Sequence, residues 1–461
     1  MRKAARTISG VTPVAVMTLP MNCPGQCIYC PTFSDTPQSY TPRSPAVLRA
    51  KSCEFDAGQQ VKMRLRILSD MGHPTDKIEL IVMGGTFLAS SEDYQYRFIK
   101  GCFDALNGRE SANLKEAKQL NETALHRCTG LCIETRPDWC GQEQIDRMLE
   151  FGATRVELGV QTLDDEIYRL VRRGHTVADV VTATRLLREH AFKVHYHWMP
   201  GLPGSTPEKD LALSEQLFSD PRFRPDGLKI YPTMVVEGTE LERWYLDGQY
   251  QPYTDDIMTD LVADIKTIVP GYVRISRVLR DIPSEFIVGG LKDSLRDVVK
   301  QRMRLLGTEC KCIRCREYGH RVRAGREAGP PRMVRTDYEA SGDREVFLSF
   351  EDEDETLFGL LRMRVQSEGV TGLMQNAADN LALIRELHIF GPEVPLNEQN
   401  PAAAQHKGLG RALLAEAERI AGEEFQVRQI AVLSGTGARE YYRSGSDYSL
   451  QADYMVKNLQ S

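Results

Sequence analysis

The sequence contains no hydrophobic run long enough to cross a membrane as a helix. Its apolar runs, such as Leu80–Met83, have the length of a strand, whereas a membrane-spanning helix needs about 20 apolar residues. Arg2, Lys3 and Arg6 stand near the start of the chain, but no apolar stretch follows them as it would in a secretory signal. We therefore expect a cytoplasmic protein that has no membrane partner.

Long internal repeats and low-complexity segments are also missing from the sequence. Hydrophobic residues make up 41% and charged residues 26% of the chain, which is ordinary for a globular protein. At 461 residues the chain is too long for one ordinary hydrophobic core. Length therefore predicts two or three domains.

The 11 cysteines are unevenly distributed along the chain. Disulfides are rare in the cytoplasm, so closely spaced cysteines there indicate metal ligands. Two groups of three have such close spacing: Cys23, Cys27 and Cys30, and Cys310, Cys312 and Cys315.

Short apolar segments alternate with helical patterns through the first 300 residues. Such alternation predicts parallel βα units, and six units would make an incomplete barrel of the TIM type. Polar residues gather where the strands end, which is where βα barrels place their chemistry. The six expected strands are at residues 13–19, 77–83, 130–134, 155–160, 193–199 and 227–231.

The pattern changes in the last third of the chain, where antiparallel strands and an amphipathic helix are expected. The strands are at residues 345–350, 356–365, 382–390 and 429–434, and the helix is at 409–423. We predict an α/β chain in three parts: an incomplete (β/α)6 barrel at residues 1–299, a basic linker at 300–340 and a separate α/β domain at 341–461.

Cys23, Cys27 and Cys30 have the spacing Cys-x3-Cys-x2-Cys and directly follow the first expected strand. Three thiolates on one loop suit a [4Fe–4S] cluster that leaves one iron without a protein ligand. That iron can be chelated by S-adenosylmethionine, whose cleavage then yields a radical. A zinc site is the alternative, but structural zinc needs four ligands and no fourth lies nearby.

This cysteine loop resembles that of the radical-SAM superfamily, in which it also follows the first barrel strand. The resemblance implies a glycine-rich turn and polar strand ends that contact S-adenosylmethionine. For Arg155 and Glu157 an ion pair that stiffens the barrel is the alternative. The implied contacts are Gly84, Gly85, Thr86, Glu134, Arg136, Arg155, Glu157 and Gln161.

A glycine-rich segment precedes the amphipathic helix of the last third: Gln405, His406, Lys407, Gly408, Leu409, Gly410 and Arg411. Such a turn offers free backbone N–H groups and a favourable dipole to a phosphate, and its glycines allow close approach. The segment resembles the loop that cradles the acetyl-CoA pyrophosphate in GNAT acetyltransferases. The resemblance implies a GNAT acetyltransferase domain here.

The rest of that domain supplies further candidates. Glu386, Leu387 and His388 lie on the strand before the loop, and Glu386 and His388 are either bases or ordinary strand residues. Tyr441 and Tyr442 lie on a later helix; either could act as a general acid or only pack against acetyl-CoA. The residues after Tyr442 depart from the pattern that is usual in GNAT acetyltransferases.

The linker is strongly basic, although the whole chain has a formal net charge of −6. Cys310, Cys312 and Cys315, with His320 close behind, suit a structural zinc ion, and free thiols are the alternative. A basic stripe suits phosphate contacts. The alternative is a solvated linker whose charge is incidental. The candidate nucleic-acid contacts are Arg314, Arg316, Arg321 and Arg323.

The combination of both motifs on one chain is very similar to the family of the catalytic subunit of Elongator, which modifies the wobble uridine of tRNA. The resemblance covers nearly the whole chain. Stretches that carry it are Met83–Phe87, Glu134–Asp138, Asp226–Thr233, Arg280–Pro283 and Gln405–Gly410.

The resemblance implies a mechanism. A radical derived from S-adenosylmethionine would abstract hydrogen from the acetyl methyl, and the carbon radical would add to C5 of the uridine, giving 5-carboxymethyluridine after hydrolysis. Lys229 and Tyr231 would contact the base or the acetyl group. Arg274, Arg277 and Arg280 join the tRNA contacts, with internal ion pairing as the alternative.

The implied partners are tRNA, acetyl-CoA and S-adenosylmethionine. Few residues precede Cys23, and in this the sequence resembles the bacterial form of the family. The resemblance implies that such members need no other Elongator subunits. The chain could also form a homodimer. The competing functions are a protein lysine acetyltransferase with a structural iron–sulfur cluster and a tRNA clamp with inactive domains. Intact cysteines and an intact glycine loop argue against the clamp.

Overall fold

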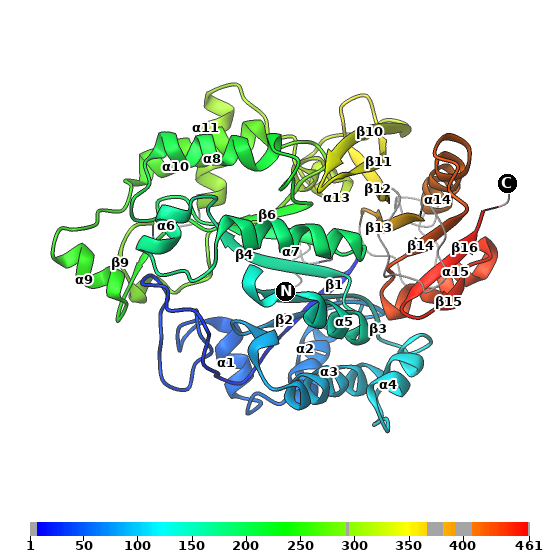
Figure 1. Cartoon of the computed structure of the whole chain (residues 1–461), viewed down its shortest axis with the longest axis horizontal. Helices are drawn as coiled ribbons and strands as arrows, with labels where there is room; N and C mark the ends of the chain where they lie inside the picture. The colour runs from blue at the N-terminus through cyan, green and yellow to red at the C-terminus, as the bar shows by residue number, and fades with distance from the viewer. Residues whose placement is uncertain (1–6, 292–294, 367–380, 392–407, 460–461) are drawn as a thin grey trace.

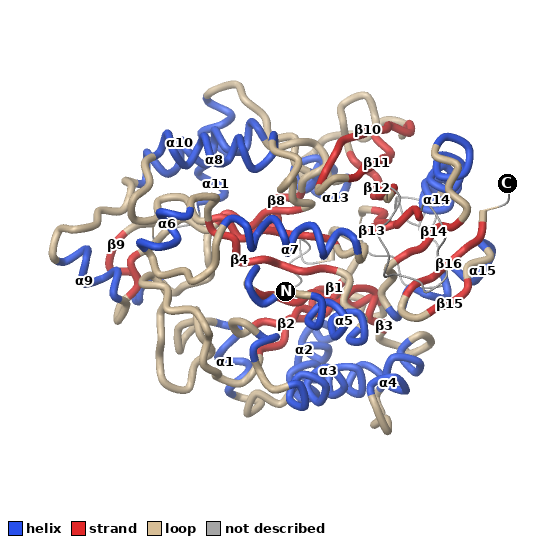
Figure 2. Tube along the Cα trace, in the orientation of Figure 1, coloured by secondary structure: helices blue, strands red, loops and turns tan. Residues whose placement is uncertain are grey.

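The computed structural model describes residues 7–291, 295–366, 381–391 and 408–459. Within these residues it contains two seven-stranded sheets and one two-stranded sheet, and Figures 1 and 2 show the two large sheets side by side. No helix in the described ranges is long and apolar enough to cross a membrane.

The first large sheet is parallel throughout, in the order β1-β2-β3-β4-β5-β6-β8. Its two edge strands, β1 and β8, do not pair in this order, so the barrel is open. The strands are β1 (Thr12–Met17), β2 (Lys77–Met83), β3 (Arg127–Thr135), β4 (Arg155–Gln161), β5 (Lys193–Trp198), β6 (Gly227–Ile230) and β8 (Arg274–Val278).

All six strands expected from the sequence are present, and β8 is an additional seventh. The strand Arg274–Val278 reads Arg-Ile-Ser-Arg-Val, so two arginines interrupt its short apolar pattern. The (β/α)6 expectation is therefore one strand too small. The two-stranded sheet pairs β7 (Val235–Val236) with β9 (Ile287–Gly289) beside the barrel.

Helices cover the outside of the barrel (Figure 1). Strand residues that face them, such as Ile78, Leu80 and Val82 of β2, are fully buried and apolar. The helices are α1 (Pro45–Lys51), α2 (Ala57–Asp70), α3 (Glu92–Asn107), α4 (Leu114–Asn121), α5 (Gln142–Phe151), α6 (Asp165–Leu170), α7 (Val177–Glu189), α8 (Pro207–Ser219), α9 (Glu240–Leu246), α10 (Asp255–Ile268) and α11 (Leu295–Leu305).

The opposite face of the same strands lines the barrel and carries charged side chains. Arg155 Nη1 lies 2.6 Å from Glu79 Oε1, and Arg155 Nη2 lies 3.5 Å from Glu157 Oε1. Lys229 forms an ion pair with Glu157 as well. Closed TIM barrels usually hold layers of branched aliphatic residues, so the charged interior of this open barrel departs from that pattern.

The second large sheet has the order β10-β11-β12-β13-β14-β16-β15. Only the pair of β13 and β14 is parallel. Their pairing ends at Ile384 and Val432, where β14 itself ends while β13 continues to Ile389. The strands are β10 (Arg332–Ala340), β11 (Asp343–Glu351), β12 (Leu357–Val365), β13 (Leu381–Ile389), β14 (Gln429–Val432), β15 (Ser449–Gln451) and β16 (Tyr454–Asn458).

The four strands expected in this part correspond to β11, β12, β13 and β14. The expected helix corresponds to α14 (Leu409–Arg419) and the π-helical turn Ile420–Glu424, and α15 (Arg439–Ser446) follows later. The structure places β10 in the second sheet, although its residues fall in the range expected to be linker. The remaining linker contains α12 (Ile313–Arg316) and α13 (Tyr318–Arg323).

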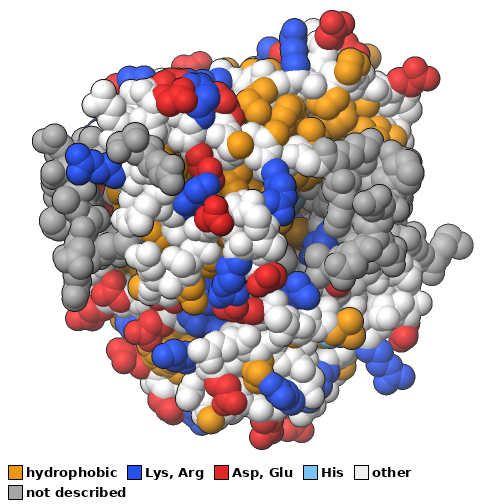
Figure 3. Space-filling model, turned by 90° about the vertical axis from the view of Figure 1, so that its right-hand side faces the viewer, with side chains coloured by type: hydrophobic (Ala, Val, Ile, Leu, Met, Phe, Trp, Pro, Cys, Tyr) orange, Lys and Arg blue, Asp and Glu red, His pale blue; other side chains and the backbone are white. Residues whose placement is uncertain are grey.

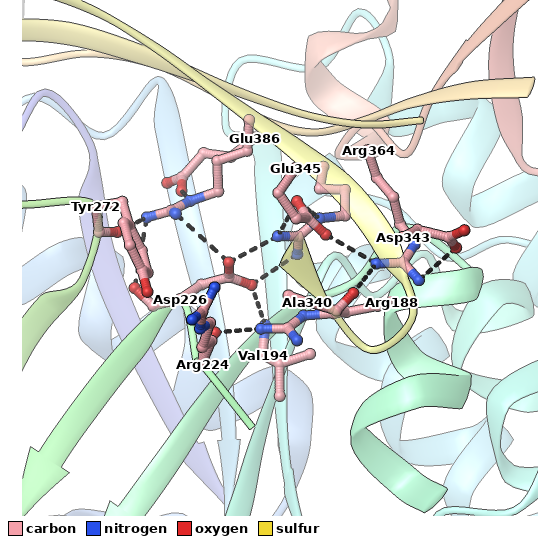
Figure 4. A network of polar contacts seen from close by, with 12 residues as sticks. Arg188, Val194, Arg224, Asp226, Tyr272, Ala340, Asp343, Glu345, Arg364 and Glu386 are labelled. Atoms are coloured by element: carbon pink, nitrogen blue, oxygen red, sulfur yellow. Dashed lines mark hydrogen bonds and ion pairs between the residues drawn. The ribbon is translucent and has the colours of Figure 1, made fainter. Parts of the chain in front are cut away.

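The second sheet lies against the amino-terminal ends of the barrel strands, and Asp226, directly before β6, is the centre of this contact (Figure 4). Arg385 of β13 donates to both carboxylate oxygens of Asp226, each at 2.7 Å, and also pairs with Glu345 of β11. Arg362 of β12 lies 3.4 Å from the same aspartate. Lys193 of β5 adds an ion pair to Glu386 at 3.1 Å. These residues join the two domains through buried charges.

Burial alone would raise the pKa of Asp226, but Arg385 and Arg362 hold that pKa well below its usual range. Asp226, Arg385 and Arg362 are at most 1% exposed. Removing one partner of such a group leaves the other charges buried and uncompensated, which destabilises a protein much more than loss of an exposed ion pair.

We predict that Asp226→Asn lowers the free energy of unfolding by about 3–5 kcal/mol, because Arg385 and Arg362 are buried and each loses one of its two counter-charges. Urea denaturation followed by circular dichroism measures this value. Asp247→Asn is the matched control, since Asp247 is exposed at the end of α9 and should change stability by less than about 0.5 kcal/mol. Equal stability of the two variants would contradict the role assigned to Asp226.

Candidate active site

A pocket opens at the carboxyl ends of the barrel strands, where the sequence predicted chemistry. Both halves of the expected site, the cysteine loop after β1 and the polar strand ends, contribute to its wall. The predicted residues that line it are Cys23, Cys27, Cys30, Gly85, Thr86, Glu134, Arg136, Glu157, Gln161, Lys229 and Tyr231.

The cysteine loop is fitted closely to the barrel. Cys23 Sγ lies 3.5 Å from Thr86 Oγ1. A Cβ on Gly25 would lie only 1.9 Å from Arg136 Nη1, so glycine is the residue that leaves room for this guanidinium. Arg136 is itself fixed by two hydrogen bonds to Asp138, at 2.9 and 2.8 Å.

The two cysteine groups differ in how their sulfur atoms are arranged. The thiols of Cys310, Cys312 and Cys315 all lie within 4.8 Å of one another, which suits one shared ion. Thiolates on one tetrahedral zinc lie about 3.8 Å apart. The thiols of the Cys23 loop do not form such a group among the described residues. That wider arrangement fits ligands of different irons in a cluster.

Lys229 lies between two carboxylates inside the pocket. Its Nζ lies 3.1 Å from Glu134 Oε1 and forms a closer ion pair with Glu157, which also interacts with His197 Nε2 at 3.1 Å. Burial would lower the pKa of Lys229, but Glu157 holds it well above its ordinary value. Tyr231 packs edge-on against His197. The pocket therefore holds a charged ammonium group beside a phenol.

Two predicted cofactor contacts lie outside the pocket wall. Gly84 has a φ of +129°, and a Cβ there would lie 2.1 Å from Thr18 Oγ1, so this glycine is required by the turn. Arg155 lies deeper in the barrel, where it pairs with Glu79 and Glu157. The ion pair that stiffens the barrel is thus the arrangement present.

The predicted nucleic-acid contacts divide into two groups. Arg277 and Arg280 line the pocket, but Arg277 also pairs with Asp281 and Arg280 donates to the carbonyl and hydroxyl oxygens of Ser39. Arg323 is exposed on α13. The others lie at internal contacts or are partly buried: Arg274 pairs with Glu317, Arg316 pairs with Glu351, Arg321 donates to the carbonyl of Asp354, and Arg314 is only partly exposed. Five of the arginines expected to contact phosphates thus bind acids or oxygen atoms of the protein itself.

The glycine loop of the second domain leads into α14, and Gln405, His406 and Lys407 lie outside the described residues. Gly408 is the N-cap of α14 with a φ of +81°, followed by Leu409, Gly410 and Arg411. A Cβ on Gly410 would lie 2.7 Å from the Tyr441 hydroxyl. Arg411 lies over the Tyr441 ring and donates to the carbonyls of Ser444 and Gly445.

The remaining candidates of this domain have structural partners. Tyr442 is only 5% exposed and packs in the core, so of the two tyrosines Tyr441 is the one at the glycine loop. Glu386 pairs with Lys193 and Arg362, which hold its pKa well below the ordinary value despite burial. Leu387 packs against the core of the second sheet, and His388 Nε2 contacts the Ser9 carbonyl at 2.6 Å. Glu386 is therefore poorly suited to act as a base.

His320, suggested as a fourth ligand for the linker cysteines, does not belong to their group. Its Nε2 lies 4.0 Å from Glu317 Oε2, and burial lowers its pKa to about 4. Three thiols are thus the ligands that the described linker brings together.

Three residues that line the pocket, Arg173, Gln38 and Tyr40, were not predicted, whereas His197 belongs to the polar residues expected at the strand ends. Arg173 stands beside Arg172 in a charged stretch that reads as an exposed turn. Gln38 and Tyr40 lie in a loop without regular periodicity.

The face of the molecule on the side of the second domain carries mixed charges. Lys and Arg side chains lie among Asp and Glu side chains over the described part of this face, and an apolar area lies near its top (Figure 3). The pocket arginines Arg277 and Arg280 belong to the barrel instead.

Comparison with known proteins agrees with this geometry. A model of the radical SAM superfamily matches residues 17–215, and a model of the radical SAM C-terminal domain matches residues 225–304. The open parallel barrel and its three-cysteine loop are therefore a radical SAM domain. That class implies a [4Fe–4S] cluster and S-adenosylmethionine, and the cysteine loop with its flanking arginines fits such an anionic cluster.

Relatives that match nearly the whole chain identify the family within the radical SAM class. The chain is 64% identical to a tRNA uridine(34) acetyltransferase of Dehalococcoides mccartyi, with 100% of both chains covered, and 42% identical to the human Elongator complex protein 3, with 99% of this chain and 86% of the relative covered. The solved structure of an archaeal Elp3 from Methanocaldococcus infernus with an N-terminal deletion matches at a TM-score of 0.87 and 45% identity, covering 98% of this chain and 100% of that one. The chain belongs to the family of tRNA uridine(34) acetyltransferases and Elongator complex protein 3, and the α/β fold class is confirmed.

We predict that Gly25→Ala lowers the iron bound per chain after anaerobic reconstitution, because the new methyl group collides with the anchored Arg136 and displaces the cysteine loop. Iron analysis with absorbance near the visible cluster band measures the loss. Gly422→Ala is the control, since a Cβ there has its nearest neighbour at 3.9 Å. Full iron content in Gly25→Ala would show that the loop tolerates the collision.

Proposed function

We propose that this chain modifies the wobble uridine of tRNA and forms 5-carboxymethyluridine from acetyl-CoA with the help of S-adenosylmethionine. The observation that carries this proposal is the pocket in which three cysteines meet a charged lysine between two glutamates. The names of the full-length relatives, which refer to uridine 34 of tRNA, support the same reaction.

In the first domain, Cys23, Cys27 and Cys30 would hold the cluster, and six pocket residues would surround S-adenosylmethionine. Bound there, the cluster and this cosubstrate supply a radical that abstracts hydrogen. Lys229, held charged by Glu157, would stabilise negative charge on the uridine or the acetyl group, and Tyr231 would orient its partner. The six surrounding residues are Gly85, Thr86, Glu134, Arg136, Glu157 and Gln161.

In the second domain, acetyl-CoA would lie beyond the end of β14, beside the part of β13 that continues past it. The first turn of α14, from Gly408 to Arg411, has free backbone N–H groups suited to the pyrophosphate. Tyr441 stands beside that turn and would contact the thioester end or protonate the leaving thiolate.

For tRNA, Arg277 and Arg280 at the pocket and Arg323 on α13 are the proposed phosphate contacts. A wobble base lies in a single-stranded loop, which makes its extrusion into a pocket inexpensive. We further propose that the chain works in the cytoplasm without other Elongator subunits and that homodimer formation is to be tested by its mass in solution.

The decisive experiment incubates the anaerobically reconstituted protein with unmodified tRNA, acetyl-CoA, S-adenosylmethionine and dithionite. We expect 5-carboxymethyluridine in the digested tRNA by mass spectrometry, and none with Cys27→Ala, because that variant lacks one cluster ligand. Cys140→Ala is the control, since Cys140 is buried in the same domain away from the pocket. Acetylated protein lysine without modified uridine would instead establish the lysine acetyltransferase alternative.

The linker cysteines carry a separate prediction. We propose that Cys310, Cys312 and Cys315 bind zinc, because their thiols converge as one tetrahedral ion requires. Metal analysis should find equimolar zinc in the wild type and in Cys27→Ala, and loss of it in Cys312→Ser. Zinc that disappears with Cys27 rather than with Cys312 would reverse the assignment of the two groups.

A further inference from the structure

Arg173 is a buried cation at the cysteine loop. It lies in the turn after α6, and its side chain and backbone together are only 7% exposed. Its Nη1 donates to the sulfur of Cys27 at 3.4 Å, and its Nη2 donates to the carbonyl oxygen of Gly159 on β4. The guanidinium thus bridges the cysteine loop and a barrel strand.

No carboxylate balances this charge among the described residues. The hydrogen-bond partners of Arg173 are one thiol and one carbonyl, and its Nε is buried without a partner. An unpaired buried cation destabilises a protein by several kcal/mol unless an anion is nearby. The arrangement therefore indicates an anionic group at the cysteine loop.

The surroundings are built to hold this cation. A Cβ on Gly159 would lie 2.6 Å from Arg173 Nη2, so that glycine leaves space for the guanidinium. Arg136 approaches the same loop from β3 and also has a buried nitrogen, Nη1, without a partner. The pKa of the neighbouring His175 is lowered to about 2 by its burial and by the two arginines, so the histidine adds no competing charge.

We infer that Arg173 is a positioning residue that raises the reduction potential of the cluster held by Cys23, Cys27 and Cys30, through its hydrogen bond to the Cys27 sulfur. One-electron reduction adds one negative charge to the cluster. A fixed positive charge and a donor to a ligating sulfur stabilise that added charge, and such donors tune cluster potentials. The inference rests on the proposed function only in requiring that the cluster forms.

The test is a redox titration of the reconstituted wild type and Arg173→Gln, without tRNA or acetyl-CoA, followed by electron paramagnetic resonance of the reduced cluster. At the wild-type midpoint potential we expect the ratio of reduced to oxidised cluster to fall about tenfold in the variant, a shift of about 59 mV for one electron. Arg169→Gln is the control, because it removes the same charge from an exposed position on α6.

Two further variants separate the possible causes. Arg173→Lys keeps the charge but cannot bond to both Cys27 and Gly159, so we expect a smaller shift in the same direction. Gly159→Ala displaces the guanidinium without removing it and should also lower the potential, which keeps the test valid if Arg173→Gln does not fold.

Each outcome decides the inference. Unchanged potentials in Arg173→Gln and Gly159→Ala, with full iron content, overturn it, and a wild-type potential in Arg173→Lys overturns the role of the hydrogen bond. A wild-type protein that binds no iron overturns the proposed function itself, and this inference with it. A shift in Arg169→Gln of the same size would mean that overall charge, rather than Arg173, sets the potential.

Discussion

The buried charges around Asp226 are the interaction on which the arrangement of the whole chain depends. Asp226 lies at the start of β6 in the barrel, and the arginines that neutralise it, Arg385 and Arg362, come from neighbouring strands of the second sheet. The barrel alone would hold Asp226 without these partners, whereas Arg385 and Arg362 would keep only Glu345 and Glu386 of their own sheet. Folding of the two domains is therefore coupled through one carboxylate. The same contact holds the second sheet against the amino-terminal ends of the barrel strands.

This coupling extends into the barrel. From the pocket downward, Lys229 pairs with Glu157, Glu157 with Arg155, and Arg155 with Glu79. Lys193, at the start of β5, then pairs with Glu386 of the second sheet. Charged residues thus fill the interior from the cysteine pocket to the domain interface. The ion pairs of the pocket and those of the domain interface are therefore neighbours within one charged interior.

The sequence predicted the parts of the molecule that have local signals. Short apolar segments between helical patterns predicted the six barrel strands, and the spacing of Cys23, Cys27 and Cys30 predicted the cluster loop. Strand β8 was missed because its arginines conceal its apolar alternation. Arg173 was missed because an arginine in a turn is normally exposed, and only the packing of Gly159 and Cys27 around it shows that it is buried. Such contacts join residues far apart in the sequence and have no pattern within it.

The charged floor of the barrel also bears on how such a protein can change over evolutionary time. Many two-domain enzymes exchange or lose a domain because each has its own apolar core and a hydrated surface at the boundary. Here Asp226 and Lys193 lie at the boundary, and their counter-charges Arg385, Arg362 and Glu386 belong to the second sheet. A barrel produced without the second sheet would hold Asp226 and Lys193 without these partners. Loss of the second domain would therefore require replacement of both residues in the barrel.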